Sequence, residues 1–406
     1  MNFLQNDNIL SIRVYLCSFI IILLGLTAPL ASNGIVILLS ISSIIILNKY
    51  YLKTSTKNDI KILIILFLIL FAWSFISNIW GPENQYWKCL KTFVIIFLGI
   101  SFSINIYNLS DTNKKRLLNS AILSCIVMII IFLIESLSSG IIIKNIIDIH
   151  ESQILEKVAR GTVILSILAT PFAIYIYMLN KKLGLIFLII SLISIISLPM
   201  TAALVGMLLG VSFALFIFVF GNKFCNFILI SFSIYVLFAP FISSNILTIQ
   251  KLRQNEIFLS SPHEHRIGIW EYSSNAAIKH LPFGLGFDSS RYLGAKNDKI
   301  EQMRKNENYA PDALPLHPHN AVIQIWLELG GVGVLLLLGL LYSSIRIINK
   351  IKNIYQKAIG MSLVGSITPP LILNFGVWQA WWLATIMLCI SLSLTIDMCS
   401  TKIKKR

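Results

Sequence analysis

The chain has 406 residues, of which 56% are hydrophobic and only 13% are charged. Soluble domains carry about 25% charged residues, and apolar runs such as residues 60–79 and 183–220 are too long for a soluble core to bury. The composition therefore excludes an ordinary soluble protein and predicts a polytopic membrane protein. The net charge of +15 then reflects membrane topology and contact with anionic membrane lipid, and we do not expect nucleic-acid binding.

The six cysteines lie within or beside apolar runs, so the sequence predicts neither a disulfide framework nor a cysteine-based metal site. The first apolar run follows Arg13 and leads directly into another apolar run. This arrangement favours a retained first span over a cleaved signal peptide.

Windows of about 20 mostly apolar residues can cross a membrane as helices. The chain contains twelve such windows, and the divisions near Pro199 and Gly376 are the least marked. The windows are residues 14–31, 34–48, 61–80, 89–108, 117–138, 161–179, 183–199, 201–220, 224–242, 331–348, 358–376 and 378–397. We therefore predict an all-α polytopic membrane protein with about twelve transmembrane helices. The pattern also allows eleven or thirteen.

The connectors between these windows alternate in charge. A basic group follows every even-numbered window, whereas the short odd-numbered connectors hold little beyond Lys88 and Lys91. The basic groups are Lys49, Lys53, Lys57 and Lys61; Lys114, Lys115 and Arg116; Lys181 and Lys182; Lys223; Arg346, Lys350, Lys352 and Lys357; and Lys402, Lys404, Lys405 and Arg406. Because positively charged loops stay in the cytoplasm, this pattern predicts a multi-pass topology with both termini cytoplasmic.

Two longer connectors face outward in this topology. Residues 139–160 have the pattern of an amphipathic helix at the membrane interface. The larger connector, between the ninth and tenth windows, holds most of the histidines, and its nine acidic residues balance nine Lys and Arg residues. The predicted division is an N-terminal bundle (1–242), a long helical outer loop (243–330), and C-terminal spans with a basic tail (331–406).

Within the outer loop, residues 264–280 have the apolar spacing of an amphipathic helix. The sequence Pro-Phe-Gly-Leu-Gly at 282–286 predicts a tight turn. Residues 288–308 are polar, and we expect a helix with irregular flanks there. A second loop helix is predicted at 319–329, immediately before the tenth window.

Two arginines are candidate anion-binding residues, because a guanidinium group binds phosphate through two parallel hydrogen bonds and stays charged. Arg160 lies at the outer edge of the sixth window, and taken alone such a position favours an arginine that extends to lipid headgroups. Arg266 follows Ser260 and Ser261, which can cap a helix and place the arginine in its first turn beside free N–H groups. A surface salt bridge is the alternative for Arg266.

His317 and His319 flank a proline just before the second loop helix. Histidine is the side chain best suited to exchange a proton near neutral pH, although such a pair can also be merely solvated. Asn320 can cap the helix that follows, and Glu328 is either a partner of the histidines or an ordinary carboxylate on the helix face. Together with His263 and His265 the pair could bind zinc, but the spacing matches no known ligand pattern. The glycine run at 330–333 favours close backbone packing.

These residues carry a resemblance to a known family. The pattern H-P-H-N-x-x-x-Q-x-x-x-E-L-G-x-x-G at 317–333 follows R-x-x-I-W at 266–270 and P-F-G-x-G at 282–286. It resembles the periplasmic signature of the O-antigen ligase/polymerase family, and Arg160–Gly161 resembles that family's arginine at the membrane edge. The similarity covers most of the chain but does not separate ligases from polymerases. The segment between Gly286 and Pro315, where contacts to the acceptor are expected, is compact. The pattern therefore does not identify the acceptor.

The resemblance implies a GT-C-like, inverting glycosyltransferase on the periplasmic face of the bacterial inner membrane. Its donor would be a glycan on undecaprenyl pyrophosphate. Its acceptor would be lipid A–core in a ligase, another glycan in a polymerase, or a protein in a protein O-oligosaccharyltransferase.

The resemblance also assigns roles to particular residues. It implies that His319 is the catalytic histidine and that His317 assists it, while Arg160 and Arg266 bind the donor pyrophosphate. We expect Asn320, Glu328 and Arg291 to be supporting residues, and we expect neither a metal nor another cofactor.

A membrane transporter is the rival from another class of protein. Transporters place ionisable residues at mid-membrane, often in broken helices. Apart from Glu135, near the end of a window, the predicted spans hold no acid or base in their interiors. The sequence therefore favours an enzyme.

Overall fold

The computed structural model describes all residues except 1, 49–57, 147–149, 297, 304–309 and 397–406. The basic groups predicted at 49–57 and 402–406, and part of the polar segment 288–308, lie outside these described residues. The named elements of the described chain are all helices. The predicted all-α class is therefore confirmed.

Each of the twelve predicted windows coincides with a helix. These helices are α1 (Asn2–Leu30), α2 (Gly34–Ile45), α4 (Asn58–Ile76), α5 (Tyr86–Tyr107), α6 (Asp111–Leu137), α9 (Thr162–Leu179), α10 (Lys181–Ile196), α11 (Thr201–Phe220), α12 (Asn222–Asn245), α16 (Ala321–Asn349), α17 (Ile354–Leu373) and α18 (Ala380–Ser393). Eight helices of the described chain are long and apolar enough to cross a membrane, and α2 and α18 are shorter apolar helices. The chain is a polytopic membrane protein, and the count of twelve spans stays a prediction.

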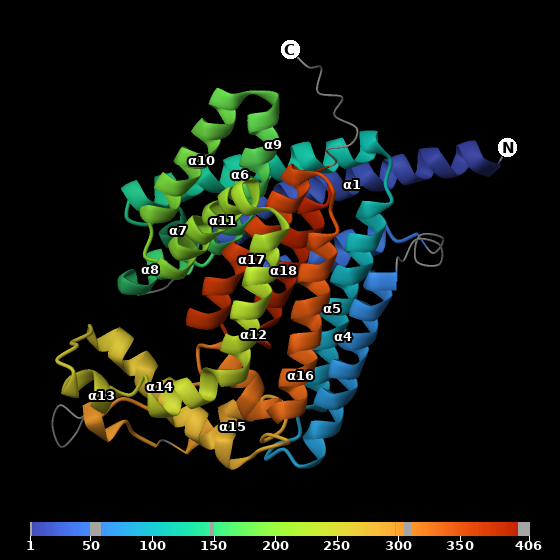
Figure 1. Cartoon of the computed structure of the whole chain (residues 1–406). Helices are drawn as coiled ribbons and strands as arrows, with labels where there is room; N and C mark the ends of the chain where they lie inside the picture. The colour runs from blue at the N-terminus through green and yellow to red at the C-terminus, as the bar shows by residue number, and fades with distance from the viewer. Residues whose placement is uncertain (1, 49–57, 147–149, 297, 304–309, 397–406) are drawn as a thin grey trace.

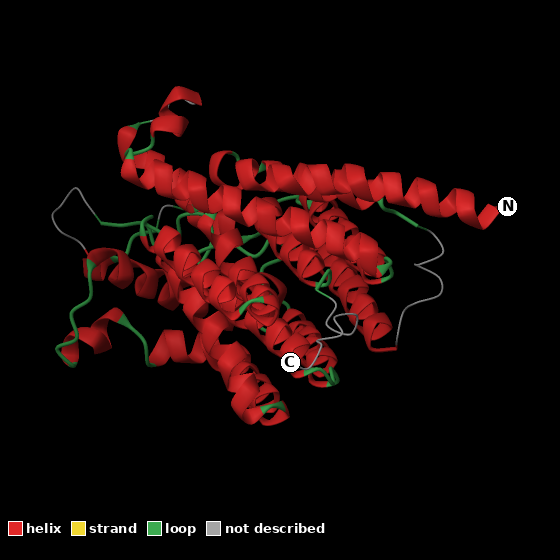
Figure 2. Ribbon diagram, turned by 90° about the horizontal axis from the view of Figure 1, so that it is seen from above, coloured by secondary structure: helices red, strands yellow, loops and turns green. Residues whose placement is uncertain are grey.

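The helices form a bundle in which neighbours come from distant parts of the sequence. α4 and α12 both pack against α16, and α11 packs against α17. α1 packs along α6, and the two run across the other helices (Figure 1). Seen from above, α1 lies along one side of the bundle (Figure 2).

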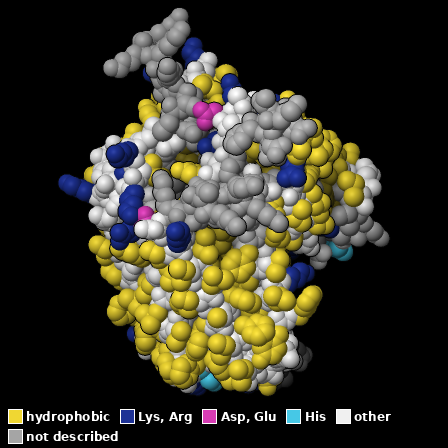
Figure 3. Space-filling model, turned by 90° about the vertical axis from the view of Figure 1, so that its right-hand side faces the viewer, with side chains coloured by type: hydrophobic (Ala, Val, Ile, Leu, Met, Phe, Trp, Pro, Cys, Tyr) yellow, Lys and Arg dark blue, Asp and Glu magenta, His cyan; other side chains and the backbone are white. Residues whose placement is uncertain are grey.

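The two ends of the bundle differ in the way the charge pattern predicts. The α9–α10 turn, which carries Lys181 and Lys182, and the C-terminal end of α16 lie at the top in Figure 1. The outer-loop helices α13 (Ile249–Gln254), α14 (Ser261–Lys279) and α15 (Ser290–Ala295) lie at the bottom. On the face seen in Figure 3, hydrophobic side chains cover the lower half, and Lys and Arg gather above them. The orientation of this bundle in a membrane stays a prediction.

The outer loop shares its core with the bundle. Phe287 is 1% exposed, and it belongs to the same hydrophobic cluster as Phe93 of α5 and Trp382 of α18. The helix predicted at 264–280 is α14, which begins three residues earlier than predicted. Because the loop packs on the ends of the spans, it forms a fixed surface on which side chains can be positioned.

The outer connector 139–160 contains two short helices, α7 (Ile141–Ile146) and α8 (Glu151–Ala159), and not one interfacial helix. Ile143 and Ile154 are buried in the main core. The buried carboxylate of Glu135 accepts hydrogen bonds from the N–H groups of Ile142, at 2.7 Å, and Ile143, at 3.3 Å. Glu135 therefore stabilises the start of α7, which gives this acid a structural role.

A helix break at Gly330 separates the loop part of α16 from its apolar part. Gly330 has φ 63° and ψ −160°, a conformation that glycine adopts readily. The turn at 282–286 satisfies the backbone groups near the break. Leu285 N–H donates to Leu327 O at 2.9 Å, Gly286 N–H donates to Glu328 O at 2.8 Å, and Gly331 N–H donates to Pro282 O at 2.8 Å. The predicted loop helix at 319–329 and the predicted span at 331–348 are thus two helices joined at this glycine.

We predict that Gly330→Ala destabilises the protein, because a Cβ at this position would lie 2.2 Å from Pro282 O in a backbone conformation unfavourable for alanine. Backbone strain of this kind costs about 1–3 kcal/mol. Gly331→Ala is the matched control, since its Cβ would meet only Pro282 O, at 3.7 Å. Thermal unfolding in detergent should show a lower midpoint for the first variant only. Equal midpoints for the two variants would contradict the role of the break.

Candidate functional site

The start of α16 is fixed by Asn320, as the sequence predicts. The side-chain oxygen of Asn320 accepts hydrogen bonds from the N–H groups of Val322, at 3.0 Å, and Ile323, at 3.2 Å. Its side-chain nitrogen donates to the Tyr235 hydroxyl of α12 at 2.7 Å. Asn320 therefore joins the cap of one helix to the side of another, and it fixes the direction in which the preceding histidines leave the helix.

Gln324 and Glu328 follow Asn320 at intervals of four residues, which places all three on one face of the helix. The side chain of Glu328 is fully buried. Its carboxylate accepts hydrogen bonds from Asp288 N–H at 2.9 Å, Gln324 Nε2 at 3.0 Å and Trp378 Nε1 at 2.5 Å. The N–H and hydroxyl groups of Ser290 also donate to it. Glu328 therefore ties α16 to two other segments of the site, and no hydrogen bond among the described residues joins it directly to His317 or His319.

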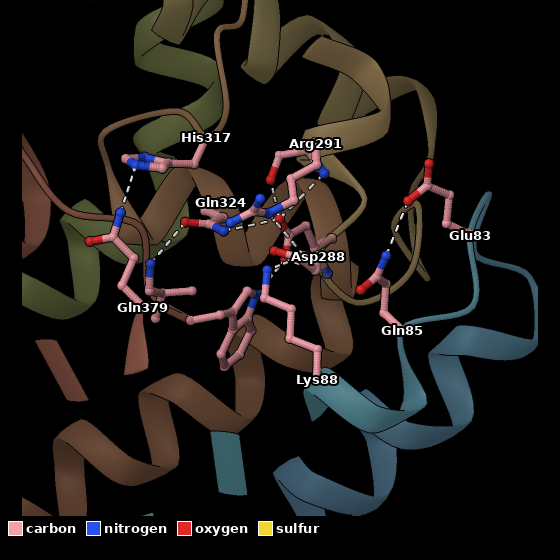
Figure 4. Close-up of polar contacts among 12 residues, drawn as sticks. Glu83, Gln85, Lys88, Asp288, Arg291, His317, Gln324 and Gln379 are labelled. Carbon is pink, nitrogen blue, oxygen red and sulfur yellow. Dashed lines mark hydrogen bonds and ion pairs between the residues drawn. The ribbon is translucent and has the colours of Figure 1, made fainter. Parts of the chain in front are cut away.

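Asp288, two residues after the 282–286 turn, holds two cations. Its carboxylate is bound by Lys88 Nζ and lies 3.3 Å from Arg291 Nε. Figure 4 shows Lys88 and Arg291 reaching Asp288 from different elements. Asp288 is 5% exposed, whereas Lys88 is 28% and Arg291 is 52% exposed. The two cations can therefore be reached from solvent.

Lys88 has no functional assignment from the sequence pattern. The available signal was its position, since it is a lysine at the predicted outer end of a span, where the charge pattern otherwise places few basic residues. A basic residue there indicates either an outward anion site or an ion pair with the outer loop, and the structure shows the ion pair.

His317 and His319 lie beside each other, with ring centroids 4.3 Å apart. His319 has φ 54°, which is unusual for a residue other than glycine. Its backbone N–H donates to His317 Nδ1 at 3.2 Å. Its own Nδ1 lies 2.7 Å from the carbonyl oxygen of Asn374. Because a carbonyl only accepts, Nδ1 of His319 carries the proton, and neutral His319 therefore has its lone pair on Nε2.

The connector between α17 and α18, residues 374–379, forms a second wall of the site that the sequence did not predict. Besides Asn374, it contributes Val377, whose N–H donates to Gln324 Oε1 at 2.9 Å. Gln379 Nε2 lies 3.1 Å from His317 Nε2. In the sequence this segment is only the weak division between two apolar windows, so no pattern marked it as functional.

Burial is the largest cause of the lowered pKa values of both histidines. It lowers the pKa of His317 to about 3, with further contributions from the electrostatic interaction with His319 and from the positive charges of Arg291 and Lys88. Burial also lowers the pKa of His319; the hydrogen bond to Asn374 opposes this shift, and the charge of Arg266 adds to it. Both imidazoles are therefore neutral at pH 7. The positive charge of Arg266 thus disfavours protonation of His319, and the charges of Arg291 and Lys88 disfavour protonation of His317.

Arg266 lies in α14, but its predicted place in the first helical turn is wrong. Ser260 is the N-cap residue, so Arg266 is the sixth residue of the helix and lies in its second turn. The free N–H groups of the helix start therefore do not add to an anion site at this arginine.

The neighbouring histidines of α14 have other partners. His263 Nδ1 lies 2.6 Å from Ser260 Oγ, and His265 Nε2 lies 2.8 Å from Asp312 O. Among the residues that the structure describes, no group of three or more His, Cys, Asp or Glu side chains is arranged to hold a metal ion.

Arg160 is exposed at the turn between α8 and α9. The next residue, Gly161, packs on the backbone of α1, where an added Cβ would lie 2.4 Å from Ala28 O. Within the described part of the chain, no hydrogen bond or ion pair joins Arg160 to Arg266 or to either histidine. The structure thus brings together the histidines, Asn320, Glu328 and Arg291, while a shared role for Arg160 stays a prediction.

The fold and site define a polytopic membrane protein with a packed loop at one end of the bundle that carries neutral histidines beside fixed cations. Residues 186–338 match the family described as O-antigen ligase. The chain is 30% identical to the protein named "Putative polysaccharide ligase" of Rickettsia bellii over 339 residues, which cover 78% of this chain and 76% of the relative. The protein of that name from Rickettsia felis is 29% identical over 324 residues, with the same two coverages. The chain belongs to the O-antigen ligase family, a family of membrane glycosyltransferase-like enzymes.

We predict that the two histidines make stability depend on pH in a defined direction. An unfolded histidine has a pKa of about 6.5, and both folded values are lower. The contribution of the neutral histidines to the free energy of unfolding is fully present above about pH 6.5. It falls as the pH drops toward 3, because the unfolded state then binds more protons than the folded state. At pH 5 this effect lowers the free energy of unfolding by up to about 2 kcal/mol for His317.

The measurement is the thermal unfolding midpoint between pH 7 and pH 5 for the native chain and for His317→Asn. Asparagine removes the titrating group while keeping a polar atom near Nδ1. The decline should be shallower in the variant, whereas parallel curves would show that His317 does not titrate in this way.

We predict that Glu328→Gln lowers both stability and activity. A glutamine turns one acceptor oxygen into a donor, which then faces groups that also donate, and each buried unsatisfied group costs about 1–3 kcal/mol. The matched control is Glu264→Gln, which removes a partly exposed ion pair with Arg253 in the same loop and should cost no more than about 1 kcal/mol. Thermal unfolding compares the two, and similar losses would contradict the central position of Glu328.

Proposed function

We propose that the chain is an O-antigen ligase-like, inverting glycosyltransferase of the bacterial inner membrane. In this proposal it moves a glycan from undecaprenyl pyrophosphate to a lipid A–core acceptor on the periplasmic face. The observation that carries the proposal is the state of His319. Its Nδ1 proton is held by a backbone carbonyl, its Nε2 keeps the lone pair, and no described hydrogen bond occupies Nε2.

The proposed reaction uses this lone pair directly. The acceptor hydroxyl attacks the anomeric carbon from the side opposite the pyrophosphate. A bond from the acceptor oxygen to that carbon forms, and the bond from the carbon to the phosphate oxygen breaks. His319 Nε2 takes the hydroxyl proton, and the lipid pyrophosphate leaves with the electron pair. A positioned base of this kind contributes about 10²–10⁴-fold to the rate.

Fixed cations support the departure of the pyrophosphate. Negative charge grows on the leaving group as the bond breaks, and preorganised cations stabilise that growth. We assign Arg266 and Arg160 to the donor pyrophosphate, and we assign His317, Asn320, Glu328 and Arg291 to support of the site. Because the arginines supply positive charge, the proposed reaction does not depend on a divalent metal.

The electrostatics also link donor binding to base strength. In the free protein, the charge of Arg266 contributes to the lowered pKa of His319. A pyrophosphate bound at Arg266 would offset that charge and raise the proton affinity of His319. His319 would therefore become a stronger base only when the donor is present. This favours removal of the acceptor hydroxyl proton over protonation of His319 from solvent in the free protein.

We predict that His319→Ala lowers glycan transfer to lipid A–core by about 10²–10⁴-fold, because the positioned base is lost. The matched control is His280→Ala, an exposed histidine of the same loop whose Nδ1 bonds only to Ala276 O. Membranes with equal amounts of each variant are compared by gel electrophoresis of lipopolysaccharide. Normal glycan capping in the His319 variant would disprove the catalytic assignment.

The same gel separates a ligase from a polymerase when the chain is deleted. Loss of a ligase leaves lipid A–core without polymer while carrier-linked polymer accumulates. Loss of a polymerase leaves lipid A–core capped with single repeat units. Protein O-glycosylation is the remaining alternative, and it predicts unchanged lipopolysaccharide with loss of glycan from a protein.

A further inference from the structure

The connector between α17 and α18 contacts both imidazoles of the candidate site. Its first residue, Asn374, accepts the Nδ1 proton of His319 through its carbonyl oxygen. Its last residue, Gln379, brings its side-chain amide to His317. Between them, Gly376 lies against the His317 ring so closely that an added Cβ would be 2.9 Å from ring atoms. The two histidines are therefore held by one short segment that lies far from them in the sequence.

The hydrogen bonds determine which nitrogen of His317 carries the proton. His317 Nδ1 accepts the backbone N–H of His319, so it has no proton of its own. Neutral His317 must then carry its proton on Nε2, the nitrogen that faces Gln379. Two N–H donors do not bond to each other. The Gln379 amide oxygen is buried without a partner, and a half-turn of the amide group places that oxygen opposite His317 Nε2–H.

The backbone of His319 depends on this arrangement. A positive φ at a residue other than glycine is strained and persists only when neighbouring contacts hold it. The bond from His319 N–H to His317 Nδ1 is such a contact, and it requires that His317 keep its proton on Nε2. A continuous chain of bonds thus runs from Gln379 through His317 and His319 back to Asn374.

We propose that Gln379 is a positioning residue that sets the tautomer of His317 and, through it, the orientation of His319 Nε2. A purely local role is not supported, because Gln379 precedes α18 as its N-cap residue but its side chain makes no capping hydrogen bond. The catalytic meaning of this role rests on the proposed function, whereas the tautomer itself is a property of the protein alone.

Two substitutions of similar length separate an acceptor from a donor at this position. Gln379→Glu supplies only acceptor oxygens and should preserve the proton on His317 Nε2. Gln379→Lys supplies only donors and should displace that proton to Nδ1, which breaks the bond to His319 N–H. The readout is ¹⁵N NMR of the full chain in detergent, labelled at histidine, since protonated and unprotonated ring nitrogens have distinct chemical shifts. His317→Asn and His319→Asn assign the signals.

We expect the native chain and Gln379→Glu to show the proton on Nε2 of His317 and on Nδ1 of His319, and Gln379→Lys to change the His317 signal. Identical His317 signals in all three proteins would overturn the proposal. Transfer of an undecaprenyl-pyrophosphate-linked glycan is measured in parallel. The glutamate variant should stay within a few-fold of native activity and the lysine variant should lose about 100-fold, the order expected for a misplaced group.

The two readouts distinguish the failure of this inference from the failure of the proposed function. A tautomer change in the lysine variant, with no transfer activity in any protein including the native chain, would support the positioning role and reject the reaction. Equal loss of activity in both variants, with unchanged histidine signals, would show that Gln379 is needed only for packing. Size-exclusion profiles and unfolding midpoints of the variants confirm that the folded proteins are being compared.

Discussion

The buried carboxylate of Glu328 is the interaction on which the candidate site depends. It accepts hydrogen bonds from the loop at Asp288 and Ser290, from Gln324 on its own helix, and from Trp378 in the α17–α18 connector. Burying a carboxylate is costly unless donors surround it. The three segments must therefore meet at this point, and two of the donors, Gln324 and Asp288, also contact further residues of the site. Gln324 joins the carboxylate to the connector, and Asp288 joins it to Lys88 and Arg291.

The helix break at Gly330 gives this arrangement its position at the end of the bundle. An unbroken α16 would satisfy its own backbone groups and leave the 282–286 turn without partners. The break instead presents the carbonyl groups of Leu327 and Glu328 to the N–H groups of Leu285 and Gly286. Irregular backbone near a membrane is stable only when protein groups satisfy it. The loop is thereby attached to the spans through backbone hydrogen bonds, which do not depend on the side chains of the turn.

The charges of the site are arranged to keep both histidines neutral. Burial and the nearby cations disfavour a protonated imidazole, while the carbonyl of Asn374 partly offsets this effect at His319. A neutral imidazole with one nitrogen held by a carbonyl can accept a proton only through the other nitrogen. The same cations that disfavour protonation can bind an anion, so one set of charges can serve both the base and the leaving group in the proposed reaction.

Much of the fold follows from the sequence because it depends on local patterns. Hydrophobic length predicts the helices, Asn320 predicts the start of α16, and the glycine run predicts close packing at Gly330. The family follows from motifs within a single loop, and so do the candidate roles of His317, His319 and Glu328. The first-turn position of Arg266 was wrong because the apolar spacing predicted a helix that begins at residue 264, whereas α14 begins three residues earlier, at Ser261.

Only the tertiary structure could decide which distant residues complete the site. Lys88 lies 200 residues before its partner Asp288, and Gln379 lies 62 residues after His317. Neither belongs to a local motif, because their contacts arise from helix packing and not from spacing along the chain. The sequence by itself determined a membrane bundle with a histidine motif at the start of a helix. The packing of the α17–α18 connector against Glu328 and the histidines decided how those histidines are held, since hydrogen bonds between distant segments exist only after the helices have met.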